Sequence, residues 1–179
     1  MTPEEKRIRN SIHEAAHAVY AIKHGVFVKD ISINKDRLLE LYVSLNCEGV
    51  TRTARPDRPT IDVCLSLMGI AVTIENTNRP VGAPVTQEEL NEATPDAQND
   101  LARIRKLYRD QGLSDLIMNE DCLICLPYSM SFARDFMPVI KAVAEVVRNQ
   151  EIVTGDEVAD IIKRIENSDD PRSKDLGPL

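Results

Sequence analysis

The sequence predicts a mainly helical (α+β) domain with a small β-sheet near its N-terminus. Most of the 179 residues lie in segments whose apolar side chains recur at a helical spacing of three or four residues. Residues such as Gly25 and Gly112 separate these segments, as expected where helices end. Only two short stretches, 26–33 and 41–45, have the β-branched and alternating pattern of strands. We therefore expect one domain over residues 1–166.

Each helix is predicted from a start signal followed by an apolar stripe. The first helix begins at Thr2-Pro3-Glu4-Glu5, in which Thr is the cap and Pro the first helical residue, and it ends at His24. The remaining predicted elements are a basic loop over 51–59, a helix from Thr60 to Glu75, a short helix from Thr86, a helix over 94–111, a short helix and a loop over 113–127, a helix over 129–149 that Pro138 kinks or divides, a helix from Thr154 to Ile165, and a disordered tail over 167–179.

Charge and hydrophobicity argue against two classes of partner. The chain has 22 basic and 29 acidic residues, and a net charge of −7 does not provide the basic surface that binds nucleic acid. The longest mostly apolar run, 63–74, is too short to cross a bilayer, and the N-terminus lacks a secretory pattern. Four cysteines without an export signal indicate free thiols in a reducing cytoplasm. We expect a cytoplasmic protein without nucleic-acid or membrane partners.

The first predicted helix contains an HExxH motif, His13-Glu14-Ala15-Ala16-His17. Residues four apart lie about 40° apart around a helix, so both imidazoles can reach one ion. Glu14 projects beside such an ion, where it can act as a base on a metal-bound water. Two imidazoles, a carboxylate and an open position describe a catalytic Zn²⁺ site. The motif therefore predicts a zinc metalloendopeptidase that hydrolyses peptide bonds through a metal-activated water, and a pair of structural histidines is the weaker interpretation.

A third zinc ligand must come from elsewhere in the chain. His24 cannot bend back along one helix to the ion, and we interpret it as a cation at the helix C-terminus. Asp100 is the first candidate because it extends the apolar edge formed by Ile104 and Leu107. Glu75, at the end of the apolar stripe of its helix, is the second. We interpret the remaining acidic residues of that region as a solvated face: Glu88, Glu89 and Glu92.

These residues resemble a known family. HEAAH is similar to the HEAGH motif of the FtsH family of membrane-bound AAA zinc proteases, and the resemblance covers residues 8–166. Further segments that agree in order are 28–33 (VKDISI), 97–103 (AQNDLAR), which resembles the segment with the family's third zinc ligand, and 151–158 (EIVTGDEV). The resemblance implies that His13, His17 and Asp100 ligate zinc, that Glu14 is the general base, and that the substrate is a polypeptide.

The sequence also departs from the family. Ala16 replaces a glycine, most polar residues of a family helix are missing over 68–75, and the chain carries neither a transmembrane helix nor a P-loop. The resemblance then implies a peptidase domain that acts alone on flexible chains or together with a separate unfoldase. Whether the chain forms a homo-oligomer is left open. The competing interpretation is a zinc-stabilised, non-proteolytic binding or regulatory module derived from that domain.

Two further features have alternative interpretations. Cys122 and Cys125 have the CxxC spacing of redox or zinc sites, but their apolar surroundings favour two buried thiols. A strand near a zinc helix can bind a substrate backbone by adding it to the sheet. Either 26–33 or 41–45 could provide that edge.

Overall fold

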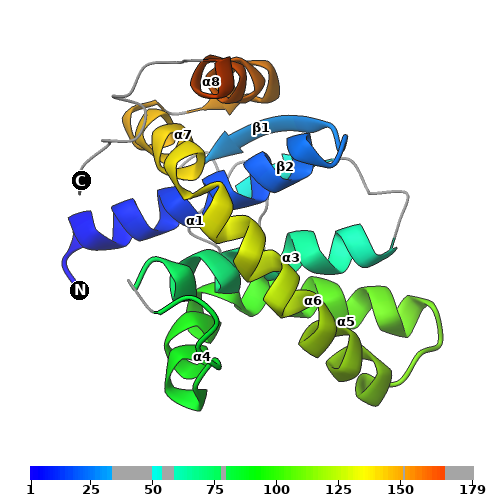
Figure 1. Ribbon diagram of the computed structural model, residues 1–179. Coiled ribbons are helices and arrows are strands. Elements are labelled where there is room, and N and C mark those ends of the chain that lie inside the picture. The colour runs from blue at the N-terminus through cyan, green and yellow to red at the C-terminus, as the bar shows by residue number, and fades with distance from the viewer. Residues whose placement is uncertain (34–49, 54–58, 78–79, 151, 168–179) are drawn as a thin grey trace. The chain divides into compact units, whose positions relative to one another are not determined.

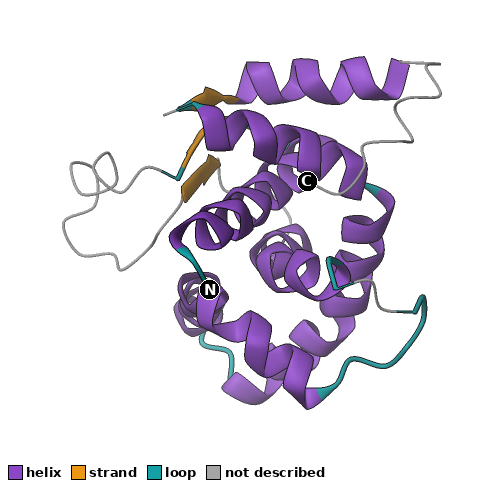
Figure 2. Ribbon diagram, turned by 90° about the vertical axis from the view of Figure 1, so that its left-hand side faces the viewer, coloured by secondary structure: helices purple, strands orange, loops and turns teal. Residues whose placement is uncertain are grey.

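The computed structural model describes residues 1–33, 50–53, 59–77, 80–150 and 152–167. It contains two compact units: Met1–Ala54 with Asp135–Leu179, and Arg55–Arg134. The described residues are mainly helical with a small antiparallel sheet, as the sequence predicts (Figure 1). Figure 2 shows the same chain by secondary structure, with the few strands gathered in one place. None of the helices that the structure describes is long and apolar enough to cross a membrane.

The first unit is built on α1 (Pro3–Lys23), which begins and ends as predicted. The Thr2 side chain accepts from the Glu5 amide, and the Glu5 carboxylate accepts from the Thr2 amide, so two helix-end amides are satisfied together. Gly25, with φ of 72°, ends the helix by taking the left-handed conformation that glycine adopts without strain. The middle of α1 is buried over 13–21, which makes it the central helix of this unit.

The sheet has the order β2-β1-β3 and both pairs are antiparallel. β1 (Val28–Ser32) lies between β2 (Val50–Thr53) and β3 (Val153–Thr154). The sheet is therefore not only N-terminal, because β3 comes from the far end of the chain. The loop predicted over 51–59 was wrong for 51–53, since β1 pairs with this segment and provides its backbone hydrogen bonds. The strand predicted over 41–45 lies outside the described residues.

Two more helices complete this unit. α7 (Met137–Asn149) packs along α1, and α8 (Gly155–Asn167) packs against α1, α7 and β1. Pro138 lies in the first turn of α7, and the predicted helix over 129–149 is divided at this point. α8 ends at Asn167, and the rest of the predicted tail lies outside the described residues. The larger fully buried side chains of this core are Val19, Tyr20, Ile31, Ile140, Val143, Val147, Val153 and Val158.

Gly155 marks the closest approach between α8 and the sheet. A Cβ atom at this position would lie 1.9 Å from the carbonyl oxygen of Val28, far inside contact distance. Only a residue without a side chain allows the start of α8 to lie this close to β1. Thr154, which directly precedes α8, pairs with Asp30 of β1.

Helices are the only regular secondary structure among the described residues of the second unit. The helix predicted over 94–111 is present as a 3₁₀ turn followed by an α-helix, and Gly112 follows it with φ of 69°. The loop predicted within 113–127 was wrong, because one helix passes through Pro127. The ring of Pro127 is exposed, while the Ser129 hydroxyl donates to the carbonyl of Cys64 and fixes the buried side. The elements are α3 (Pro59–Glu75), α4 (Gln87–Ala93), η1 (Thr94–Ala97), α5 (Gln98–Asp110) and α6 (Asp115–Asp135).

Candidate metal centre

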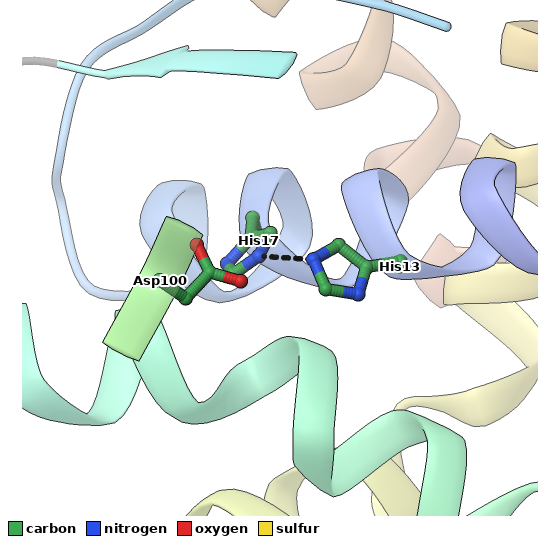
Figure 3. A group of neighbouring side chains, drawn as sticks. All are labelled: His13, His17 and Asp100. Atoms are coloured by element: carbon green, nitrogen blue, oxygen red, sulfur yellow. Dashed lines mark hydrogen bonds between the residues drawn. The ribbon is translucent and has the colours of Figure 1, made fainter. Parts of the chain in front are cut away.

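His13 and His17 form a close pair on α1. Their Nε2 atoms lie 3.1 Å apart, the ring centroids are 4.8 Å apart, and the ring planes meet at 69° (Figure 3). Each residue is only 7% exposed. The four-residue spacing brings the rings together because one helical turn separates them. The two predicted ligands thus lie side by side on α1.

The geometry of this pair fits a zinc ion. With Zn–N bonds of about 2.0–2.1 Å and tetrahedral angles, two nitrogen ligands of one ion lie about 3.3 Å apart. The 3.1 Å separation of the Nε2 atoms differs from this value by only a few tenths of an ångström. The separation of the two nitrogen atoms is therefore compatible with both rings binding one ion.

Glu14 lies between the two histidines in sequence and is 8% exposed. Its neighbours along α1 are His13 and Ala15, and both Ala15 and Ala16 are fully buried. Carboxylates are rarely buried unless they are paired or have a chemical role. Glu14 is thus a buried carboxylate in the same turn of α1 as His13 and His17.

Asp100 lies in the first turn of α5 and is half-buried. One ligand atom from each of His13, His17 and Asp100 lies within 4.8 Å of the other two (Figure 3). Among the described residues this is the one group of three or more such side chains that could hold a metal ion. His13, His17 and Asp100 are the three residues expected as ligands, and such a group could hold a metal ion.

Glu75, the second candidate for the third ligand, is engaged elsewhere. Its two carboxylate oxygens accept hydrogen bonds of 2.9 Å from Nε and Nη2 of Arg134. The Glu75 side chain is 3% exposed, so this two-point ion pair is largely shielded from water. We conclude that Glu75 ties α3 to α6 and is not part of the metal group.

The other histidine and the acidic residues of α4 also have local roles. Nδ1 of His24 donates to the carbonyl oxygen of Tyr20 at 2.8 Å, and the two rings stack at 4.0 Å. His24 thereby closes the C-terminal end of α1, as expected for a residue outside the metal site. The Glu89 carboxylate caps α4 at Thr86. Glu88 and Glu92 are exposed, as predicted.

The arginines that pair with Glu75 and Asp62 were not identified from the sequence. Besides Arg134, Nη2 of Arg103 donates to Oδ1 of Asp62 at 2.7 Å, and the Asp62 side chain is 7% exposed. Asp62 is the acidic residue in the first turn of the otherwise apolar α3. A carboxylate at the start of such a helix predicts a buried cation partner, but the sequence does not say which of the 22 basic residues provides it.

The cysteines of the second unit are free thiols, as the favoured interpretation requires. Cys64 and Cys125 are buried, and Cys122 is half-buried. Burial raises the pKa of Cys122, and burial together with a hydrogen bond to Cys64 raises the pKa of Cys125 to about 12. Reactive cysteines have a lowered pKa. No cysteine joins a metal-binding group among the residues that the structure describes.

Comparison with known proteins adds no family to these observations. No protein-family model matches the chain, and a search of curated proteins finds no relative.

Proposed function

We propose that this protein is a zinc-dependent metallopeptidase similar to the peptidase domain of the FtsH family. The observation that carries the proposal is the 3.1 Å separation of the two Nε2 atoms of an HExxH motif, with Asp100 in the same group of potential ligands. Three protein ligands with an open fourth position describe a catalytic rather than a structural zinc site.

In this proposal the residues have separate tasks. His13 and His17 hold the ion from α1, and Asp100 is the third ligand. When bound, zinc supplies a Lewis acid that polarises the scissile carbonyl and lowers the pKa of water toward 7. Glu14 takes a proton from the attacking water and returns it to the leaving amine, which is general base and then general acid catalysis.

We infer the binding place of the substrate backbone from the order of the strands in the sheet. β1 is paired on both sides, so this strand, one of the two predicted edges, cannot add a substrate strand. β2 is at the edge of the described sheet and packs against α1, the helix that carries the HExxH motif. We propose that an extended polypeptide aligns along β2, because backbone hydrogen bonding of this kind accepts many sequences.

The proposal also includes the partners and the compartment. The substrate is a polypeptide that is already unfolded or is delivered by a separate unfoldase. Free thiols at Cys64, Cys122 and Cys125 support a reducing compartment such as the cytoplasm.

The experiment compares the zinc-loaded chain with its Glu14→Gln variant on casein and on a peptide library. We expect the wild type to cleave, and we expect the variant to bind about one zinc ion per chain but to lose cleavage. Glu4→Gln, an exposed change in the same helix, is the matched control and should cleave normally. Cleavage by Glu14→Gln at the wild-type rate would reject the mechanism. A zinc-loaded wild type that cleaves nothing would favour the non-proteolytic module instead.

A further inference from the structure

We infer that Asp62 is a positioning residue for the metal site, because it holds the guanidinium of Arg103 and keeps this cation from occupying the carboxylate of Asp100. The inference rests on the proposed role of Asp100 as a zinc ligand. It assigns a task to an ion pair, between a buried carboxylate and a partly exposed guanidinium, that the catalytic chemistry does not use.

The Asp62–Arg103 pair is a fixed feature of the second unit. Nη2 of Arg103 lies 2.7 Å from Oδ1 of Asp62, which is a short, charge-assisted hydrogen bond. The side chain of Asp62 is 7% exposed and that of Arg103 is 43% exposed. A carboxylate this buried needs a cation to compensate for its lost hydration, so Asp62 holds Arg103 more strongly than a surface carboxylate would.

Arg103 follows Asp100 by three residues on α5. Side chains at this spacing lie on the same helical face with their Cβ atoms about 5–6 Å apart, and opposite charges at this spacing attract each other. An uncommitted guanidinium at position 103 would therefore compete with a metal ion for the carboxylate of Asp100. It would also repel the ion through its own charge.

Asp62 removes both effects at once. It neutralises the charge of Arg103, and it draws the guanidinium toward α3, which packs against α5. Another cation on α5, Lys106, has a different partner, because it forms an ion pair with Asp110 at 3.9 Å. Lys106 therefore offers a matched control for removal of a positive charge from the same helix.

The test measures zinc affinity by competition with a chelator on the full chain. Asp62→Asn should weaken zinc binding by on the order of 10-fold, the size of effect that residues around metal ligands commonly have. Arg103→Gln should bind zinc at least as tightly as the wild type, because the competing cation is gone. The double variant Asp62→Asn/Arg103→Gln should recover the affinity that Asp62→Asn loses, and Lys106→Gln should leave it unchanged.

Unfolding of the metal-free variants in urea, measured in parallel, separates this role from a structural one. Asp62→Asn and the double variant should be similarly destabilised, so that recovered zinc affinity cannot come from recovered stability. If the double variant binds zinc no better than Asp62→Asn, or if neither variant folds, Asp62 is only structural and the inference is overturned. A wild type that binds no zinc overturns the proposed function as well, which distinguishes the two failures.

Discussion

His13 and His17 face each other on α1 with their Nε2 atoms 3.1 Å apart. This relationship is produced within one helix, because residues four apart lie on one face and the helix itself is buried. Two potential ligands held by a single helix require little reorganisation when an ion binds. The predictions depend most on which residue provides the third ligand.

Asp100→Ala should weaken zinc binding by at least about 100-fold, because it removes a ligand, and removal of mere neighbours of ligands already changes affinity by 10–100-fold. Chelator competition at pH 7 measures this directly. The metal-free stability should change little, since Asp100 is half-buried in the first turn of α5.

Glu75→Ala is the matched comparison for Asp100→Ala. It should lower the stability of the metal-free protein and leave the zinc affinity nearly unchanged, which is the opposite of what we expect for Asp100→Ala. Loss of the carboxylate leaves Arg134 without its two 2.9 Å hydrogen bonds, so urea unfolding should show a loss of about 1–3 kcal/mol. Zinc affinity should stay within a few-fold of the wild type. If Glu75→Ala loses the metal and Asp100→Ala keeps it, the third ligand is Glu75.

Gly155→Ala should destabilise the first unit by about 3 kcal/mol, the upper range for overpacking of a well-packed site. The added methyl group would lie 1.9 Å from the carbonyl oxygen of Val28, so α8 must move away from β1. Gly112→Ala is the comparison, because its site is open and only its φ of 69° is unfavourable. We expect a loss of about 1–2 kcal/mol there. Equal losses for the two variants would contradict the close approach.

The start of α8 should contribute stability that depends on pH. The amide and hydroxyl of Thr154 donate to the Glu157 carboxylate, which lowers the pKa of Glu157 below its ordinary value of 4.5. A lowered pKa in the folded state means that the contribution is complete above pH 4.5 and is lost as the pH falls through the folded pKa.

Glu157→Gln tests whether the stabilisation by the Glu157 carboxylate is lost at low pH. The variant should be less stable than the wild type by ~0.5 kcal/mol at pH 7, a value typical of an exposed charge at a helix N-terminus. The difference should shrink toward zero at pH 3 in urea unfolding experiments. A difference that is constant between pH 3 and pH 7 would show that the charge of Glu157 is not responsible.

The thiols of Cys122 and Cys125 should react slowly in the folded protein. A rise in the pKa of Cys125 from 9.0 to about 12 reduces its thiolate fraction at pH 8 by about 10³-fold. Mass spectrometry after iodoacetamide treatment should show little modification of either residue until urea is added. Rapid native-state modification would instead favour the redox interpretation of the CxxC spacing.

Local signals in the sequence were sufficient for much of the fold. The capping residues Thr2 and Thr86 and the left-handed glycines Gly25 and Gly112 mark helix ends correctly, because these effects act within one turn of the chain. The continuous α6 and the strand over 50–53 were missed. Both depend on packing or pairing with distant residues, and local propensity does not include those contributions.

The sequence by itself determined the pair of imidazoles, because HExxH on a helix places both rings on one face whatever surrounds it. It also ranked Asp100 ahead of Glu75 as the third ligand. Only the tertiary structure showed that Arg134 occupies both oxygens of Glu75 and that Asp62 holds Arg103. The physical reason is that an ion pair forms between whichever charges the fold brings together, and residues 41 or 59 positions apart carry no local pattern that reveals it.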